Sequence, residues 1–332
     1  MISISDSSNN SNFDKIKIPS RVFIVPYRDR PQHKFFFCKY MQFILEDWDD
    51  YEIYFSHQCD DRVFNRGAVK NLGFLAVKEK YPDHYKNITF IFNDVDTMPF
   101  NKIFSYQTTL GTVAHYYGFK HTLGGIVVMK GQDFERINGF PNIWGWGQED
   151  NCLQYRCSKF NIQIDRSTFY PIGSPQILQL FDGISRIINN TDARTKTLSN
   201  DKDGISTVSN INWSIDRTSS DVKDNQFTVL HFNKNVYYIN TTCFSTVIPY
   251  NIDSFLIQDL RTKSKPKEKV NTFKLILNQS QLQKKYRSNK QKINYPQQQH
   301  QRHPQHIHKQ RAHSHLQMIK NVNNWSIIPN KY

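Results

Sequence analysis

Apolar runs and helical repeats alternate along the first 100 residues, and this order constrains the fold more than any other feature. Arg21–Tyr27, Tyr51–His57 and Asn87–Phe92 are short apolar runs typical of strands. Between them, His33–Trp48 and Arg66–Lys80 carry apolar side chains at helical spacing. This order predicts an α/β fold, in which a mostly parallel, Rossmann-like sheet is flanked by helices.

Two polar motifs follow strands of this predicted sheet. Pro26–Arg28 closes the first strand, and Asp94–Asp96 follows the third. Ligands bind beyond the carboxyl ends of parallel strands, so both motifs are candidate site residues. If the strand continues, alternation places both aspartates on one face and Val95 on the other. Paired carboxylates suit a hard divalent cation that shares a diphosphate, whereas an Asx-rich turn is the structural alternative.

A third motif, Trp144–Asp150, combines glycines, tryptophans and acids. Glycines permit a positive φ or a close approach to a ligand. Tryptophan rings offer flat apolar faces on which a sugar can stack. The acids Glu149 and Asp150 open a predicted helix, and a carboxylate there can accept the proton of an attacking hydroxyl. A tight loop with two core tryptophans is the structural alternative.

Six short blocks, in this order, resemble the beta-1,4-galactosyltransferase family. They are Val25–Arg30, Phe64–Arg66, Phe92–Asp96, Gly124–Ile126, Ile137–Asn142 and Trp144–Asp150, with a weaker echo at Ser199–Ile205. The resemblance covers about residues 20 to 165. It implies a GT-A-like nucleotide-sugar fold, a Mn²⁺-bound UDP-sugar and inversion at the anomeric carbon.

The resemblance also implies roles for individual residues. Asp150 is the implied catalytic base, Glu149 faces the donor sugar and the acceptor, and Asp96 is the implied metal ligand. Arg66 is expected to face phosphate, because a guanidinium donates paired hydrogen bonds to phosphate oxygens. The implied nucleotide-sugar contacts are Pro26, Tyr27, Arg28, Arg30, Phe64, Arg66, Asp94, Val95, Trp146 and Gly147.

Two departures from the family pattern concern the acceptor and the metal. Asn151 stands where the family usually has a further acidic residue that contacts the acceptor. The family's later metal ligand is a histidine in a Met-x-x-His segment, and the window Pro175–Phe181 holds none. His231 is the later candidate outside the tail, although a core role in an apolar strand is the alternative. The metal site is therefore incomplete or closed by another ligand.

Charge divides the chain into two parts. The net charge is +14, yet residues 261–332 hold 16 Lys/Arg and a single acid, Glu268. We expect a disordered N-terminus over 1–18, a single catalytic domain over 19–250 and a disordered, basic, low-complexity tail over 261–332. The tail allows contact with a polyanion such as nucleic acid, anionic lipid or an anionic glycan, and a solvated tail is the alternative.

No targeting segment is visible in the sequence. There is no signal peptide and no run of 18 apolar residues, so we expect a soluble protein without a transmembrane anchor. Marked use of Asn, Lys and Ile favours an AT-rich genome. This fits a protein of the cytoplasm, or of a viral factory or virion.

The favoured interpretation is an inverting, Mn²⁺-dependent glycosyltransferase. It moves a hexose, galactose or an N-acetylhexosamine, from a UDP-sugar to a glycan or glycoprotein acceptor. Two alternatives stay open. One is a degenerate family member that binds sugar or nucleotide without efficient turnover, and the other is an interaction protein that acts through its basic tail.

Overall fold

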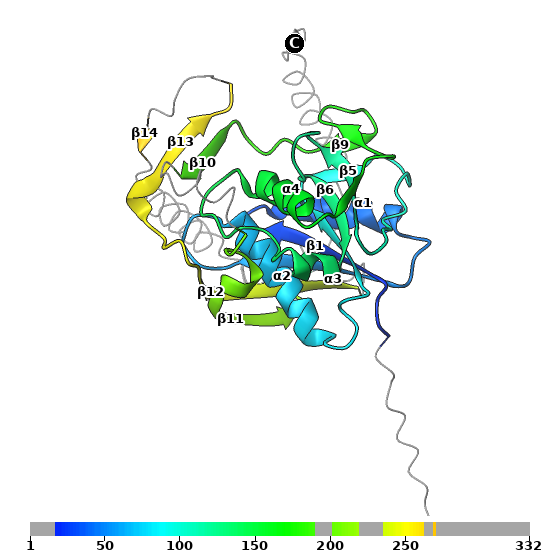
Figure 1. Cartoon of the computed structure of the whole chain (residues 1–332). Helices are drawn as coiled ribbons and strands as arrows, with labels where there is room; N and C mark the ends of the chain where they lie inside the picture. The colour runs from blue at the N-terminus through cyan, green and yellow to red at the C-terminus, as the bar shows by residue number, and fades with distance from the viewer. Residues whose placement is uncertain (1–16, 190–200, 219–234, 262–267, 270–332) are drawn as a thin grey trace, which may run out of the picture. The chain divides into compact units, whose positions relative to one another are not determined.

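The computed structural model describes residues 17–189, 201–218, 235–261 and 268–269 (Figure 1). The first elements follow the predicted order of strands and helices. They are β1 (Arg21–Tyr27), α1 (Pro31–Ile44), β2 (Tyr51–Gln58), α2 (Arg66–Lys80) and β3 (Thr89–Asn93). β1 pairs in parallel with both β2 and β3, which confirms the core of the predicted sheet.

A nine-stranded sheet extends this core on both sides, in the order β11-β12-β2-β1-β3-β6-β5-β7 with β8 on β5. Its further strands are β5 (Thr112–Gly118), β6 (Ile126–Lys130), β7 (Gln163–Asp165), β8 (Tyr170–Pro171), β11 (Ser209–Asp216) and β12 (Val236–Ser245). β12 joins β2 in parallel, while β6 runs antiparallel to both β3 and β5. The sheet is thus mostly parallel with antiparallel insertions.

Helices cover both faces of the sheet. In β1, Phe23 and Val25 pack into the cluster that contains the apolar side of α1, whereas Val22 and Ile24 pack with α2. The second face also carries α3 (Gly131–Arg136) and α4 (Glu149–Lys159). Because both faces are buried, the central strands are continuously apolar instead of alternating with polar residues.

Two small sheets lie outside the main one. β4 (Thr97–Pro99) pairs with β9 (Ile177–Gln179), and β10 (Ser185–Asn189) pairs with β13 (Phe255–Asp259), which pairs with β14 (Glu268–Lys269). Short 3-10 turns cover Ile205–Thr207 and Ile252–Ser254. β13 continues the regular structure past residue 250, where we placed the end of the domain. No helix in the described ranges is long and apolar enough to cross a membrane.

Candidate functional site

Two adjoining cavities open at the carboxyl ends of the parallel strands. The first has a volume of about 390 Å³ and the second of about 490 Å³. The loops that follow β1, β2 and β3 all contribute to the first cavity. Both cavities share six residues, which are Arg66, Asp94, Asp96, Trp146, Asp182 and Arg186.

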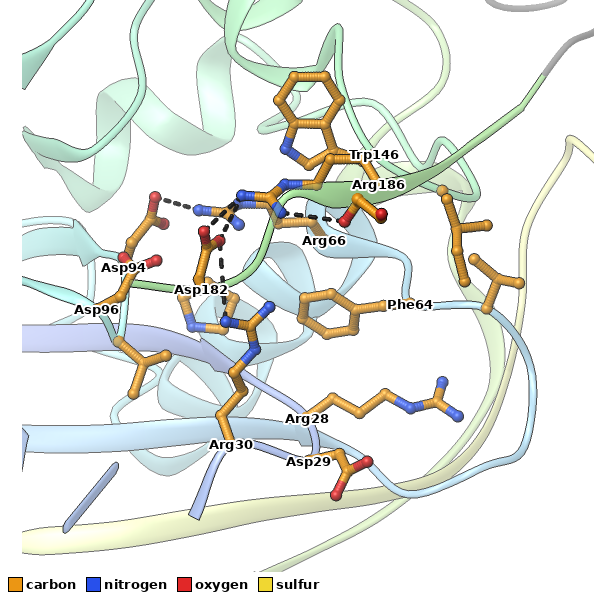
Figure 2. A pocket seen from close by; sticks show the side chains of 16 residues that line it. Arg28, Asp29, Arg30, Phe64, Arg66, Asp94, Asp96, Trp146, Asp182 and Arg186 are labelled. Atoms are coloured by element: carbon orange, nitrogen blue, oxygen red, sulfur yellow. Dashed lines mark hydrogen bonds and ion pairs between the residues drawn. The ribbon is translucent and has the colours of Figure 1, made fainter. Parts of the chain in front are cut away.

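Most of the residues predicted to contact a nucleotide-sugar line the first cavity (Figure 2). They come from three strand ends and from the Gly/Trp loop, although they are spread over 120 residues of sequence. The set is Pro26, Arg28, Arg30, Phe64, Arg66, Asp94, Val95 and Trp146, and the predicted metal ligand Asp96 lines the same cavity.

Two of the predicted nucleotide-sugar contacts do not line the first cavity. Tyr27 is fully buried and packs edge-to-face against Phe55 and His57, so the structure does not bring its side chain to either cavity. Alternation along β1 explains this position, because Tyr27 follows Phe23 and Val25 onto the face that α1 covers. Gly147 lines the second cavity. His231 is outside the residues that the structure describes.

Asp94 and Asp96 lie in a turn. β3 ends at Asn93 and β4 begins at Thr97, whose N–H donates to the Asp94 carbonyl over 3.1 Å. The expected continuation of the strand through this motif is therefore wrong. The turn still places both carboxylates at the cavity, while Val95 belongs to the core cluster of β1 and α1.

Four arginines and four aspartates line the first cavity, and several of them form ion pairs (Figure 2). Arg66 pairs with Asp94. Asp182 pairs with Arg186 at 2.6 Å and with Arg30 at 3.8 Å. The formal charges of the lining side chains cancel, so the cavity presents paired charges of both signs.

Asp96 stands apart from these pairs. Within the ranges that the structure describes, no Lys or Arg lies at ion-pair distance from it, and its Oδ1 accepts a hydrogen bond of 2.9 Å from the Thr97 hydroxyl. Burial raises the pKa of Asp96 and Asp94 raises it further, while Arg66 lowers it. Asp94 Oδ1 is also buried without a hydrogen-bond partner in the described part of the chain. This corner of the cavity therefore holds carboxylate oxygens that a cation could bind.

Glu149 and Asp150 begin α4 and line the second cavity. Glu149 is buried, and its Oε1 lies 3.5 Å from Arg66 Nε. Burial and the adjacent Asp150 raise the pKa of Glu149, and Arg66 opposes this shift. Burial by itself would lower the pKa of Arg66, but Asp94 and Glu149 raise it on balance. Arg66 thus links the acidic turn to the start of α4.

Asp150 is held between Lys70 and Gly124. Lys70 Nζ lies 3.3 Å from Asp150 Oδ1, and the Asp150 carbonyl accepts a hydrogen bond from the Leu123 N–H. A Cβ atom at Gly124 would lie 2.2 Å from Asp150 Oδ2. Only glycine therefore leaves the carboxylate in this position.

The two tryptophans of the Gly/Trp loop have different surroundings. Trp144 is buried, stacks on Phe244 and donates its indole N–H to Thr246 and to the Ile248 carbonyl. Trp146 is 40% exposed and faces both cavities. Its backbone N–H donates to the Ile187 carbonyl over 2.7 Å. Trp144 anchors the loop, and Trp146 presents a ring to the cavities.

Sequence reasoning missed three residues of the site, Gln179, Asp182 and Arg186. They lie at the end of the window Pro175–Phe181, which lacks a histidine, or just after it. Asp182 and Arg186 have opposite charges and follow the short apolar run of β9, which was the available signal. Their place at the cavity depends on the pairing of β9 with β4 and of β10 with β13, which no local pattern predicts.

Family models match the first half of the chain. Residues 14–109 match the N-terminal region of glycosyl transferase group 7, and residues 106–177 match the N-terminal domain of galactosyltransferase. Beta-1,4-galactosyltransferase 1 of Bos taurus is 34% identical over 154 residues, which cover 43% of this chain and 37% of the relative. Beta-1,4-galactosyltransferase 4 of Homo sapiens is 32% identical over 158 residues, which cover 43% of this chain and 44% of the relative. Residues 14–177, which the two models match, therefore belong to the beta-1,4-galactosyltransferase family.

The fold agrees with that of a solved family member. A mutant Drosophila beta-1,4-galactosyltransferase 7, in complex with manganese, UDP-Gal and xylobiose, superposes with a TM-score of 0.51 at 19% identity. The superposition covers 68% of this chain and 94% of that chain. The GT-A-like fold that the resemblance implied is therefore confirmed.

The aligned region spans less than half the length of the curated beta-1,4-galactosyltransferases that it matches. The family models end at residue 177. Asp182 and Arg186 consequently lie beyond the part of the chain that these models match. The acidic turn and the Gly/Trp loop lie within it.

Proposed function

We propose that the protein is an inverting glycosyltransferase that transfers a hexose, galactose or an N-acetylhexosamine, from a UDP-sugar to a glycan or glycoprotein acceptor. One observation carries the proposal. A cavity rich in arginine and aspartate adjoins a second cavity that contains a carboxylate suited to act as a base. A donor in the first cavity would place its reacting carbon at the shared boundary, within reach of an acceptor in the second.

The first cavity suits a nucleotide diphosphate. Phe64 and Pro26 offer apolar contacts to a base, and the guanidinium groups of Arg28, Arg30 and Arg66 suit phosphate oxygens. The lining charges already cancel, so a diphosphate that entered alone would leave the cavity with uncompensated negative charge. A divalent cation that enters together with the diphosphate keeps the balance.

The residues present fit such a cation. Asp96 supplies a carboxylate with no ion-pair partner among the described residues, and hard divalent cations prefer oxygen ligands. The manganese complex of the Drosophila relative supports Mn²⁺ as the ion. When bound, a divalent cation offsets charge that develops on a leaving diphosphate.

Asp150 would act as the base. Its carboxylate can accept the proton of an acceptor hydroxyl that attacks the donor sugar from the face opposite the diphosphate. Lys70 and Gly124 fix the position of this carboxylate. Exposed Phe119 and Ile172 also line the second cavity and offer apolar surface to a sugar ring. Trp146, between the two cavities, would cover the donor and keep water from it.

Calorimetric titration of UDP into the full chain, with and without Mn²⁺, tests this function. A panel of UDP-sugars assayed for transfer and for hydrolysis accompanies the titration. We expect Mn²⁺-dependent binding of UDP and turnover of one donor. Binding without turnover of any donor would favour the degenerate family member, and absence of binding would exclude a nucleotide-sugar site.

A further inference from the structure

The pairing of β4 with β9 brings a second polar segment beside Asp96. Gln179 stands opposite Thr97 in this antiparallel pair. One residue further, the Leu180 N–H donates to the Asp96 carbonyl over 2.7 Å. These bonds fix the segment 179–182 against the acidic turn. Gln179 and Asp182 accordingly line the second cavity together with Asp94 and Asp96.

Gln179 presents an amide oxygen at this place. The Tyr117 hydroxyl donates to Gln179 Oε1, which fixes the orientation of the amide. A carbonyl oxygen has two lone pairs, so one stays available for a further partner. Amide oxygens are common ligands of hard cations.

Asp182 presents a carboxylate whose present partners can be exchanged. It pairs with Arg186 at 2.6 Å and with Arg30 at 3.8 Å, and both arginines also line the first cavity (Figure 2). A diphosphate in that cavity offers both guanidinium groups new anionic partners. If the arginines turn to the diphosphate, the Asp182 carboxylate is left beside Asp96 without its counter-charge.

No set of three or more His, Cys, Asp or Glu side chains within the described ranges is placed to hold a metal ion. A cation site here needs a ligand of another residue type and an Asp182 that is released from its arginines. On the basis of the proposed function, we propose that Asp96, Gln179 and Asp182 together hold the divalent cation that accompanies the donor. The histidine that the window Pro175–Phe181 lacks is then replaced by oxygen ligands.

An all-oxygen site has a testable ion preference. Carboxylate and carbonyl oxygens suit Mg²⁺ as well as Mn²⁺, whereas an imidazole ligand disfavours Mg²⁺ relative to transition metals. We therefore expect Mg²⁺ to compete with Mn²⁺ in this protein. Replacing Asp182 with histidine should reduce that competition.

The experiment measures Mn²⁺ binding to the full chain directly, by the electron paramagnetic resonance signal of free Mn²⁺ at saturating UDP. Asp182→Asn and Gln179→Ala should each weaken Mn²⁺ binding about tenfold or more, because the first replaces a charged ligand with a neutral amide and the second removes a ligand. Asp165→Asn removes the same charge at a half-buried position outside both cavity linings and serves as the matched control. Its Mn²⁺ affinity should stay within about threefold of the wild type, because Asp165 lines neither cavity.

A second pair of variants, at Asp182 and Gln179, distinguishes residues that bind the cation from residues with a purely structural role. Asp182→His should keep Mn²⁺ binding and require about tenfold more Mg²⁺ to displace the ion. Gln179→Glu preserves the size of the side chain, adds a carboxylate and should tighten Mn²⁺ binding. If Asp182 only held Arg186, Asp182→His would leave the Mg²⁺-to-Mn²⁺ ratio unchanged. Circular dichroism and thermal midpoints establish that each variant is folded.

The outcomes distinguish this inference from the proposed function. If the wild type binds UDP only with Mn²⁺, yet Asp182→Asn and Gln179→Ala bind Mn²⁺ as tightly as the wild type, the ligand assignment is overturned and the proposed function stands. If the wild type binds UDP equally well with and without Mn²⁺ and takes up no ion, the cation site is overturned. If it binds neither UDP nor Mn²⁺, both proposals fail.

Discussion

Asp150 owes its place to two residues that are distant in the sequence. Lys70 comes from α2, Gly124 precedes β6, and Asp150 itself opens α4. We expect Asp150→Asn to bind UDP nearly as the wild type does, because the substitution keeps the shape of the side chain. Transfer should fall by about 100-fold or more, because the amide cannot accept the proton.

Single-turnover transfer and UDP titration of the same preparation measure the two effects. Asp165→Asn, in a partly exposed strand outside both cavity linings, is the matched control. Transfer by Asp150→Asn at near wild-type rate would remove Asp150 as the base. Gly124→Ala gives a second test, because the added Cβ would displace the carboxylate and should lower transfer in the same way.

His115 makes stability depend on pH. Its Nε2 donates to the Tyr117 and Gly124 carbonyls, and its Nδ1 accepts from Arg166, so the buried ring is neutral. Burial and the Arg166 charge lower its pKa to about 4. Between about pH 6.5 and pH 4 the unfolded chain binds a proton at this histidine that the folded chain does not. The free energy of unfolding therefore decreases as the pH is lowered through this range.

The loss attributable to His115 is at most about 3 kcal/mol across this window. Urea denaturation of the wild type and of His115→Gln at pH 7 and pH 5 measures it. The variant is less stable at pH 7, where it lacks the paired imidazole, and its stability should change less between the two values. Equal pH dependence in the two proteins would show that His115 does not contribute.

At the scale of residues, the sequence predicted the parts of the site that lie in compact motifs. Asp96 and Trp146 belong to short motifs whose residue types indicate cation binding and sugar binding, respectively, and both residues line the cavities. Tyr27 belongs to such a motif too, but strand alternation points its side chain into the core. Asp182 could not be predicted, because it reaches the cavity through strand pairings between distant segments.

At the scale of elements, hydrogen bonds connect the segment after residue 200 with Asn142, in the loop before Trp144, and connect Asn142 with α2. Asp203 is buried and accepts hydrogen bonds from the backbone and side-chain N–H groups of Asn142, at 2.8 and 2.9 Å. Asn142 in turn accepts a hydrogen bond from Asn71 of α2. The echo of the family pattern at Ser199–Ile205 thus includes a buried structural contact.

Asp203→Ala should therefore destabilise the fold by about 1–3 kcal/mol, because it leaves the buried backbone N–H of Asn142 without its acceptor. Denaturant unfolding measures the change, and Ser206→Ala, at an exposed neighbour, is the control. We expect the loss in stability to exceed the loss in UDP affinity. An Asp203→Ala protein as stable as the control would mean that water replaces the carboxylate.

Elements with strong, complete patterns were predicted best. β1 and α2 have the bounds that the sequence indicated, and Asn65 caps α2 by accepting a hydrogen bond from the Ala68 N–H. The sequence did not predict β5, because the polar His115 interrupts its apolar pattern and depends on Arg166, which is distant in the sequence, for one of its hydrogen bonds. β12 extends to Ser245, because β2 and β11 pair with its later residues.

At the scale of the whole molecule, the basic tail lies almost entirely outside the described residues. Its role is therefore argued from its net charge. Residues 273–332 hold 11 of the 43 Lys/Arg and no Asp or Glu, so their removal lowers the net charge from +14 to +3. A chain without them should elute from immobilised heparin at much lower salt, because fewer counterions are released on binding. UDP binding should be unchanged, because every described residue that lines the two cavities precedes position 261.

A full-length variant with these 11 Lys/Arg replaced by Gln separates charge from length. If the tail binds polyanions through charge, this variant should elute with the truncated chain. Elution with the wild type would instead assign the binding to the uncharged part of the tail. If the truncated chain keeps the wild-type salt dependence, the polyanion contact belongs to the remaining part of the chain, and the interaction-protein alternative loses its main support.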